Sequence, residues 1–134
     1  MNEKHLEFIQ SVINRMAGNS FQIKNWTVLI LTGLFVLSGK ENNYGMIYIA
    51  IVPVLFFWLL DGYYLYLERC YRGLYNRCLE GDCTDFNLDI SADKVNISYF
   101  KTLFRPAVLL IYLASIITIL SGACVLNHLK SHGV

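Results

Sequence analysis

Residues 106–126 read PAVLLIYLASIITILSGACVL, a run of 21 residues that contains no charged side chain. About 20 apolar residues in a helix are needed to cross the ~30 Å hydrocarbon core of a bilayer. Proline opens the run, and the first turn of a helix tolerates proline well. We therefore predict a transmembrane helix over residues 106–128.

The composition of the rest of the chain is also that of a membrane protein. Hydrophobic residues make up 55% of the 134 residues and charged residues only 16%, whereas soluble domains carry about 25% charged residues. The net charge of +1 indicates no particular partner. The polar N-terminal region carries Glu3 and Glu7, which argues against a cleaved signal peptide. A single membrane domain over 1–134 is predicted.

Two further spans precede the one that begins at Pro106. The first is predicted over 21–39, and its uncharged part is short, so Lys24 should lie at the membrane face with its stem buried. The second is predicted as one long helix over 45–79, in which Pro53 could introduce a kink. A helix of that length is roughly 50 Å long. Its last turns, about 68–79, should therefore project into water.

Two segments are not predicted to cross the membrane. Residues 5–17 form an amphipathic pattern too short for a span, and Gly18-Asn19-Ser20 should separate it from the first span, with Asn19 as the cap of the next helix. Its apolar face could lie on the membrane surface or pack against partner helices, and packing is favoured. Within 80–105, the alternating stretch 86–90 predicts a small strand or an ordered loop. The fold class is thus all-α, with three transmembrane helices, an N-terminal amphipathic helix and a second span extended into the cytoplasm.

Lysine and arginine residues predict the orientation. Nine lie in the N-terminal segment that ends at Lys24 or between the second and third spans, against two, Lys40 and Lys130, on the other side. Positive charge favours the cytoplasmic side, so the N-terminus and residues 67–105 should be cytoplasmic and the C-terminus outside. Cytoplasmic thiols stay reduced, so no disulfide is expected among Cys70, Cys78 and Cys83.

Asp61 is the most informative single residue, because a carboxylate within an apolar run is costly if it faces lipid. Lys24 should lie at a similar depth on the neighbouring antiparallel span, so an ion pair between the two is expected. Asp61 could lock two helices together or remain hydrated at the interface. It could instead line or gate a water-filled path. Lys24 and Asp61 are thus candidates for a pore or for assembly.

The third span carries a stripe of small residues, Ala114, Thr118 and Gly122, flanked by Ser115 and Ser121. Small residues allow helix backbones to approach closely. The stripe could serve helix packing, within or between subunits. Alternatively, its hydroxyls could line a narrow pore.

The projecting part of the long helix interleaves bases and aromatic residues. Glu68 stands four residues before one of the bases and could pair with it. The surface could be a solvated helix face inside an oligomer. It could also bind an anionic ligand, with tyrosine rings stacking on bases and arginines holding phosphates. The residues of this surface are Arg69, Tyr71, Arg72, Tyr75 and Arg77.

No motif predicts an enzyme. The sequence has no phosphate-binding glycine-rich loop, no HExxH and no nucleophile elbow. Its three histidines are scattered near the ends of the chain. We therefore predict no catalytic residue, no metal site and no cofactor.

Two stretches resemble a known family. One is FIQ at 8–10 with VINRM at 12–16, followed by NSF at 19–21 and IKNW at 23–26, and the other is FWLLDGYYL at 57–65 followed by Glu68-Arg69. Together they resemble small multi-pass membrane proteins of bacterial anti-phage defence operons that also encode a nucleotidyltransferase, in the manner of the Hailong system. The resemblance covers about residues 8–77.

The resemblance implies an oligomeric effector of the bacterial inner membrane that opens a channel during infection and depolarises the cell. It also implies control by a nucleic-acid-like product of the partner enzyme, with the 69–77 helix as the candidate sensor. Three helices of one chain leave little room for a pore, so a channel requires several subunits. The alternative is a non-conducting anchor or regulatory subunit that recruits a cytoplasmic enzyme.

Overall fold

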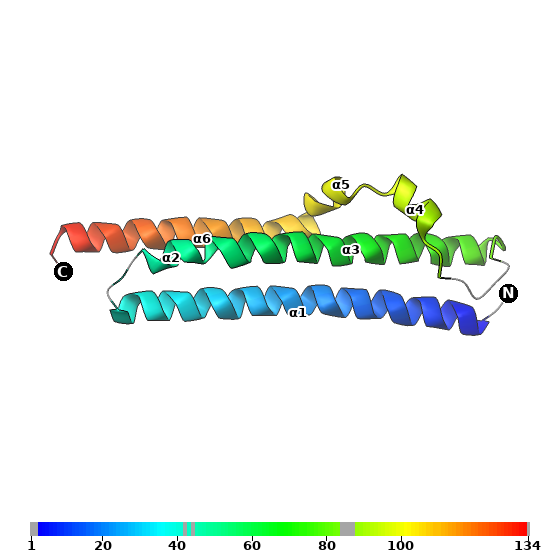
Figure 1. The fold of residues 1–134 in the computed structure, drawn as a ribbon, viewed down its shortest axis with the longest axis horizontal. Helices are drawn as coiled ribbons and strands as arrows, with labels where there is room; N and C mark the ends of the chain where they lie inside the picture. The colour runs from blue at the N-terminus through cyan, green and yellow to red at the C-terminus, as the bar shows by residue number, and fades with distance from the viewer. Residues whose placement is uncertain (1–2, 42, 44, 84–87, 134) are drawn as a thin grey trace.

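Three long helices lie side by side along one axis, with the two termini at opposite ends of the molecule (Figure 1). The computed structural model describes residues 3–41, 43, 45–83 and 88–133. Within that part of the chain every regular element is a helix, which confirms the all-α class. The elements are α1 (Glu3–Glu41), α2 (Met46–Ile49), α3 (Ile51–Leu79), α4 (Ser91–Asn96), α5 (Tyr99–Leu103) and α6 (Pro106–Ser131).

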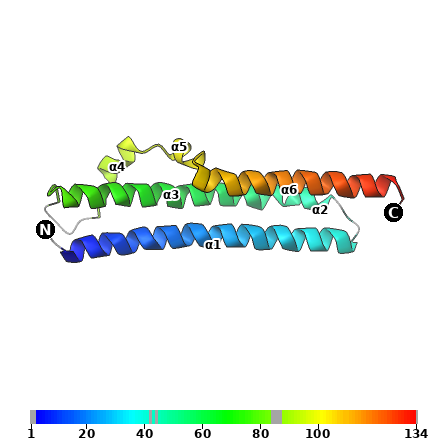
Figure 2. The same cartoon turned by 180° about the vertical axis from the view of Figure 1, so that it is seen from behind.

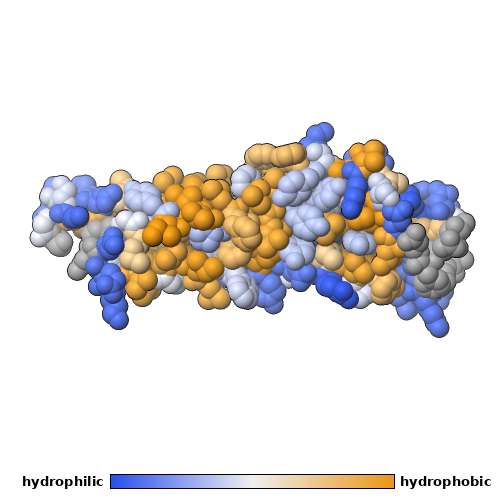
Figure 3. All heavy atoms as spheres, viewed as in Figure 1, coloured by the Kyte–Doolittle hydropathy of each residue, from blue (hydrophilic) through white to orange (hydrophobic). Residues whose placement is uncertain are grey.

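Three helical stretches are long and apolar enough to cross a membrane, namely α1, α2 together with α3, and α6. Their outward faces carry large apolar side chains, such as Leu29, which is 70% exposed, and Val52 and Leu110. A soluble monomer rarely exposes so much apolar surface. Figure 3 shows apolar residues over much of the middle of one face and hydrophilic residues at both ends. The three predicted spans are therefore present as helices.

The predicted break between an amphipathic helix and the first span is wrong. Helix α1 runs without interruption for 39 residues, so Asn19 lies within the helix and caps nothing. Gly18 costs about 1 kcal/mol relative to alanine in a helix, but this local preference is overridden by packing along the whole length of α3. Residue 20 is a buried helical contact and not part of a turn.

The predicted long helix over 45–79 ends at Leu79 as expected, but it is interrupted at Ala50 between α2 and α3. The backbone N–H of Ala50 donates to Ile47 O at 3.1 Å, which is a tighter turn than in an α-helix. Proline has no N–H to donate and its ring clashes with the carbonyl four residues earlier. Pro53 therefore accounts for the interruption directly upstream of it.

Two clusters of buried apolar residues hold the helices together. One lies among α2, α3 and α6, where it includes Ile47, Val54 and Ile119. The other joins the N-terminal part of α1 to the last turns of α3, with Ile9 and Ile13 against Cys70 and Leu74. The apolar face predicted for residues 5–17 is thus packed against protein, as favoured.

Helices α4 and α5 lie on the side of α3 that faces away from α1, as both Figure 1 and Figure 2 show. The small strand considered for 86–90 is not seen at residues 88–90, which have no regular structure. Residues 86 and 87 lie outside the described residues. Gly73 lets α4 approach closely, because a Cβ there would overlap the Asp93 carboxylate.

Candidate functional site

A buried ion pair joins α1 to α3. The Lys24 Nζ atom lies 2.7 Å from Oδ2 of Asp61, which confirms the predicted pair. The Asp61 side chain is 0% exposed and that of Lys24 is 22% exposed. An unpaired carboxylate at this depth would be very costly, so the lysine is what permits Asp61 to be charged there.

Two polar groups that the sequence analysis did not single out complete the cluster. The Ser20 hydroxyl donates to Oδ1 of Asp61 and accepts a hydrogen bond of 2.8 Å from Lys24 Nζ. The buried side chain of Tyr112 on α6 lies beside Asp61 and Thr27, but its hydroxyl makes no hydrogen bond with the described residues. The spacing of Ser20 and Lys24, four residues apart on one helix face, was a signal that could have identified the serine.

This arrangement brings α1, α3 and α6 together around one carboxylate. Because Asp61 is fully covered within a single chain, it contacts neither lipid nor an open path there. The cluster can hold the three helices in register. It can also hold an ion pair and the Ser20 hydroxyl inside the apolar part of the molecule, where low polarity strengthens each interaction.

The small residues of α6 do not form one packing face. Ala114, Thr118 and Ser121 are exposed, and the two hydroxyls donate to carbonyls of their own helix. Gly122 is half-buried against Phe35, which leaves no room for a side chain. The residues of α6 that pack within the chain lie on a different stripe, namely Val108, Tyr112, Ser115, Ile119 and Ala123.

The five residues of the basic and aromatic surface point in three directions. Arg69 donates to Thr102 Oγ1 at 3.0 Å, and Arg77 lies 2.5 Å from Asp93 Oδ2, so both face α4 and α5. Tyr71 and Tyr75 pack against the cluster shared with α1. Arg72 is exposed and pairs with Glu68 at 2.7 Å, which confirms the predicted i,i+4 contact.

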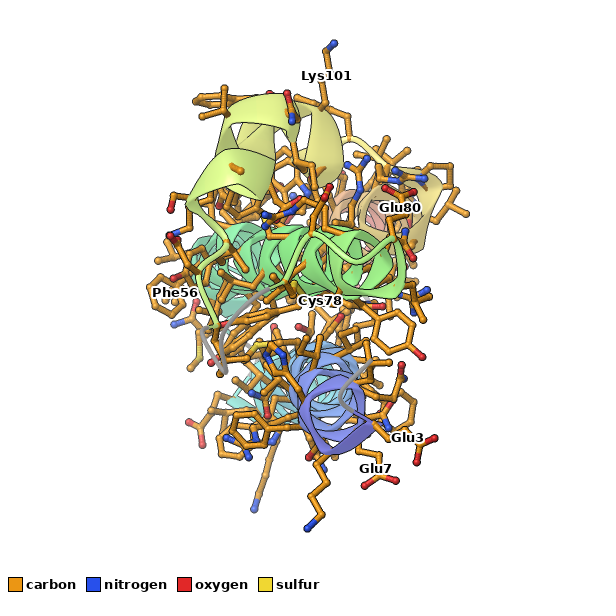
Figure 4. The ribbon with its side chains drawn as sticks, turned by 90° about the vertical axis from the view of Figure 1, so that its right-hand side faces the viewer. Glu3, Glu7, Phe56, Cys78, Glu80 and Lys101 are labelled. Atoms are coloured by element: carbon orange, nitrogen blue, oxygen red, sulfur yellow. A yellow bond between two sulfur atoms is a disulfide. The ribbon has the colours of Figure 1, made fainter. Side chains whose placement is uncertain are left out.

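The expectation of reduced thiols is contradicted, because Cys78 and Cys83 form a disulfide. Helix α3 ends at Leu79, and Gly81, with a φ of 92° that favours glycine, turns the chain so that Cys83 meets Cys78. Cys78 lies on the side of α3 that faces α1 (Figure 4). The cellular compartment predicts whether thiols tend to stay reduced. It does not predict whether the fold brings two cysteines close enough to form a disulfide.

Within the described part of the chain, no group of three or more His, Cys, Asp or Glu residues is placed to hold a metal ion. Comparison with known proteins identifies no relative of the chain. No family model matches it, and no curated protein or solved structure matches it either. The family resemblance at residues 8–77 therefore stays a prediction.

Proposed function

We propose that this chain is a subunit of a homo-oligomeric membrane channel. The observation that carries the proposal is the outward face of α6, where Ala114, Thr118 and Ser121 are exposed on a span. Hydroxyls and small residues on such a face fit a helix that meets other copies or water, and fit lipid less well. The core of the single chain is filled and its charged pair is covered, so conduction requires several copies.

In this proposal Lys24 and Asp61 serve helix packing within each subunit rather than conduction. They hold α1 and α3 together with Ser20, and they leave α6 free to present its other face. The pore would be lined by one α6 helix from each subunit around a common axis. The pathway candidates are then Thr118 and Ser121, with Ala114 allowing close approach.

The extension is the part of the molecule formed by the N-terminal turns of α1 and the last turns of α3. Its arginines offer a binding site for an anionic ligand. Arg69 and Arg77 hold α5 and α4 through Thr102 and Asp93. A phosphate-rich ligand would compete for these arginines, because phosphate accepts bidentate hydrogen bonds from guanidinium groups. Binding would therefore loosen the contacts that α4 and α5 make with these two arginines of α3. The nucleic-acid-like product of a partner nucleotidyltransferase, in an anti-phage defence role at the bacterial inner membrane, would be such a ligand.

The orientation in this proposal follows from the nine-to-two distribution of lysine and arginine. The Cys78–Cys83 disulfide weighs against it, because disulfides persist mainly in oxidising compartments. We give the charge distribution more weight because it involves the whole chain. Protease should therefore cleave the region around α4 in inverted membrane vesicles and leave it intact in spheroplasts. Cleavage in spheroplasts would reverse the assignment.

Ion flux from liposomes tests the channel. Purified protein is reconstituted with an entrapped ion reporter, and Thr118→Leu is compared with Thr32→Leu. The two threonines are a matched pair, since both are exposed on spans and both donate at 2.8 Å to a carbonyl four residues earlier. We expect flux from wild type and from Thr32→Leu, and a change of about tenfold or more in Thr118→Leu. Equal flux in both variants would remove α6 from the pathway.

The alternative function is a non-conducting anchor. The open groove beside α1 at the extension, lined by Glu3, Glu7, Gln10 and Tyr75 among others, offers a surface for a cytoplasmic enzyme. Absence of flux from wild type, both with and without a partner enzyme and its oligonucleotide product, would favour this reading over the channel.

A further inference from the structure

Helix α5 is held against α3, close to the Lys24–Asp61 ion pair, by two hydrogen bonds and one buried side chain. The Trp58 Nε1–H donates to Leu103 O at 3.1 Å, and the Tyr99 hydroxyl donates to Leu59 O at 2.7 Å. Leu103 is buried over Gly62, the residue that follows Asp61. The chain enters the span of α6 three residues later, at Pro106. This places α5 at the boundary where the apolar part of the molecule begins.

The exposed residues of this segment include two aromatic rings and two cations, and the Phe104 ring also packs edge-on against Trp58, with 5.8 Å between the ring centroids. Phe100 is 73% exposed and Phe104 is 60% exposed, although neither lies in a span. Lys101 and Arg105 are exposed beside them, and neither forms an ion pair with any described residue. Figure 4 shows Lys101 pointing away from all the helices. Phe100 and Lys101 lie on α5, and Phe104 and Arg105 follow its last residue, so the four lie within the short segment 100–105 at the entry to α6.

We infer that the exposed surface of these four residues, which we call the α5 headgroup face, binds anionic phospholipid headgroups. Its phenylalanines enter the acyl boundary while Lys101 and Arg105 meet the phosphates, which is the arrangement of an interfacial amphipathic segment. Exposure of two phenylalanine rings to water is unfavourable, and so is exposure of two unpaired cations to the hydrocarbon core. The interface suits both. The inference does not depend on whether the chain conducts ions.

The pattern favours lipid over a soluble phosphate or a protein partner. A free phosphate would gain nothing from the phenylalanines. A partner protein would need to reach a segment held at the depth where α6 enters the bilayer. Each cation near an anionic surface should strengthen lipid binding about fivefold.

The test counts bound lipids by native mass spectrometry of the purified full-length protein. The protein is exposed to equal amounts of phosphatidylglycerol and phosphatidylcholine, and the ratio of retained lipids is measured. We compare wild type with Lys101→Gln/Arg105→Gln. The matched control is Lys4→Gln/Arg15→Gln, which also removes one exposed lysine and one exposed arginine, both far along α1 from the apolar part.

We expect wild type and the control to retain phosphatidylglycerol preferentially. In the Lys101→Gln/Arg105→Gln variant, the ratio of retained phosphatidylglycerol to phosphatidylcholine should fall at least about fivefold. Phe100→Ala/Phe104→Ala should lower retention of both lipids. Inorganic phosphate in excess should not displace the bound lipid.

Three results would overturn the inference. One is equal preference in the two double variants. Another is displacement of the lipid by inorganic phosphate. The third is a change of oligomeric state, without a change in lipid retention, in the Lys101→Gln/Arg105→Gln variant. If that variant does not fold, wild type alone decides, because absence of any preference for phosphatidylglycerol would equally exclude the site.

Discussion

The distribution of polar groups reverses along helices α1 and α3. In the extension, formed by the N-terminal turns of α1 and the last turns of α3, apolar residues such as Ile9 and Leu74 lie inside and charges lie outside. In the spanning half, where α6 joins them, apolar residues cover the outside and the Lys24–Asp61 pair lies inside. This reversal is what we expect if water surrounds the extension and lipid surrounds the spanning half, since water drives apolar burial and lipid does not.

The largest effect is expected from removing one member of the buried pair. Lys24→Met leaves the Asp61 carboxylate without its cation and should cost about 3–5 kcal/mol of stability. The exposed Lys40 at the other end of α1 provides the control, and Lys40→Met should cost little. Unfolding by denaturant in detergent micelles measures both.

The double variant Lys24→Met/Asp61→Leu separates pairing from packing. If the pair acts as a lock, the double variant should recover much of the stability lost in Lys24→Met, because no charge is left buried. A double variant as unstable as the sum of the two single variants would show that the two residues act independently.

The second prediction compares the two solvents directly. Ile9→Ala in the extension removes a fully buried side chain and should cost about 2–5 kcal/mol. Leu29→Ala in the spanning half removes a side chain that faces outward, and lipid or detergent replaces its contacts, so the cost should stay below about 1 kcal/mol. Equal costs in micelles would show that Leu29 is covered by protein, as at a subunit interface.

The third and smallest effect concerns two glycines on the extension. Gly73→Ala places a methyl group against Asp93 and disturbs its pair with Arg77, at a cost of about 1–3 kcal/mol. Gly18→Ala has open space and should stabilise α1 by about 0.5–1 kcal/mol. Limited proteolysis around α4 reports the first change, and thermal unfolding reports the second. Destabilisation by Gly18→Ala would indicate a contact with another chain.

Predictions from the sequence succeeded for features that depend on whether a side chain would contact water or lipid. The apolar run from Pro106 predicted a helix long and apolar enough to cross a membrane, and the cost of an unpaired carboxylate in lipid favoured Lys24 as a partner for Asp61 at similar depth. Local signals failed where tertiary contacts were stronger. Gly18 and Asn19 favour a break, but packing against α3 continues on both sides of them and the helix persists.

The elements that sequence reasoning missed are those that depend on distant contacts. Helices α4 and α5 are too short to be stable alone, and α5 is held by Trp58 and Leu59, more than 30 positions away. The Cys78–Cys83 disulfide depends on the turn at Gly81, which a compartment argument does not address. The divergence of Arg69, Tyr71 and Arg72 around α3 follows from helical geometry, since consecutive positions lie about 100° apart.

The unbroken course of α1 has a mechanical consequence. A continuous helix of 39 residues is a stiff rod about 58 Å long, clamped to α3 near its middle by the Lys24–Asp61 pair. A clamp at that point acts as a fulcrum. Tilting the rod by roughly 5° displaces each tip by about 2–3 Å in opposite directions, on the geometry of a straight helix. A hinge at Gly18 would absorb such a tilt, whereas the intact rod carries it from one side of the molecule to the other.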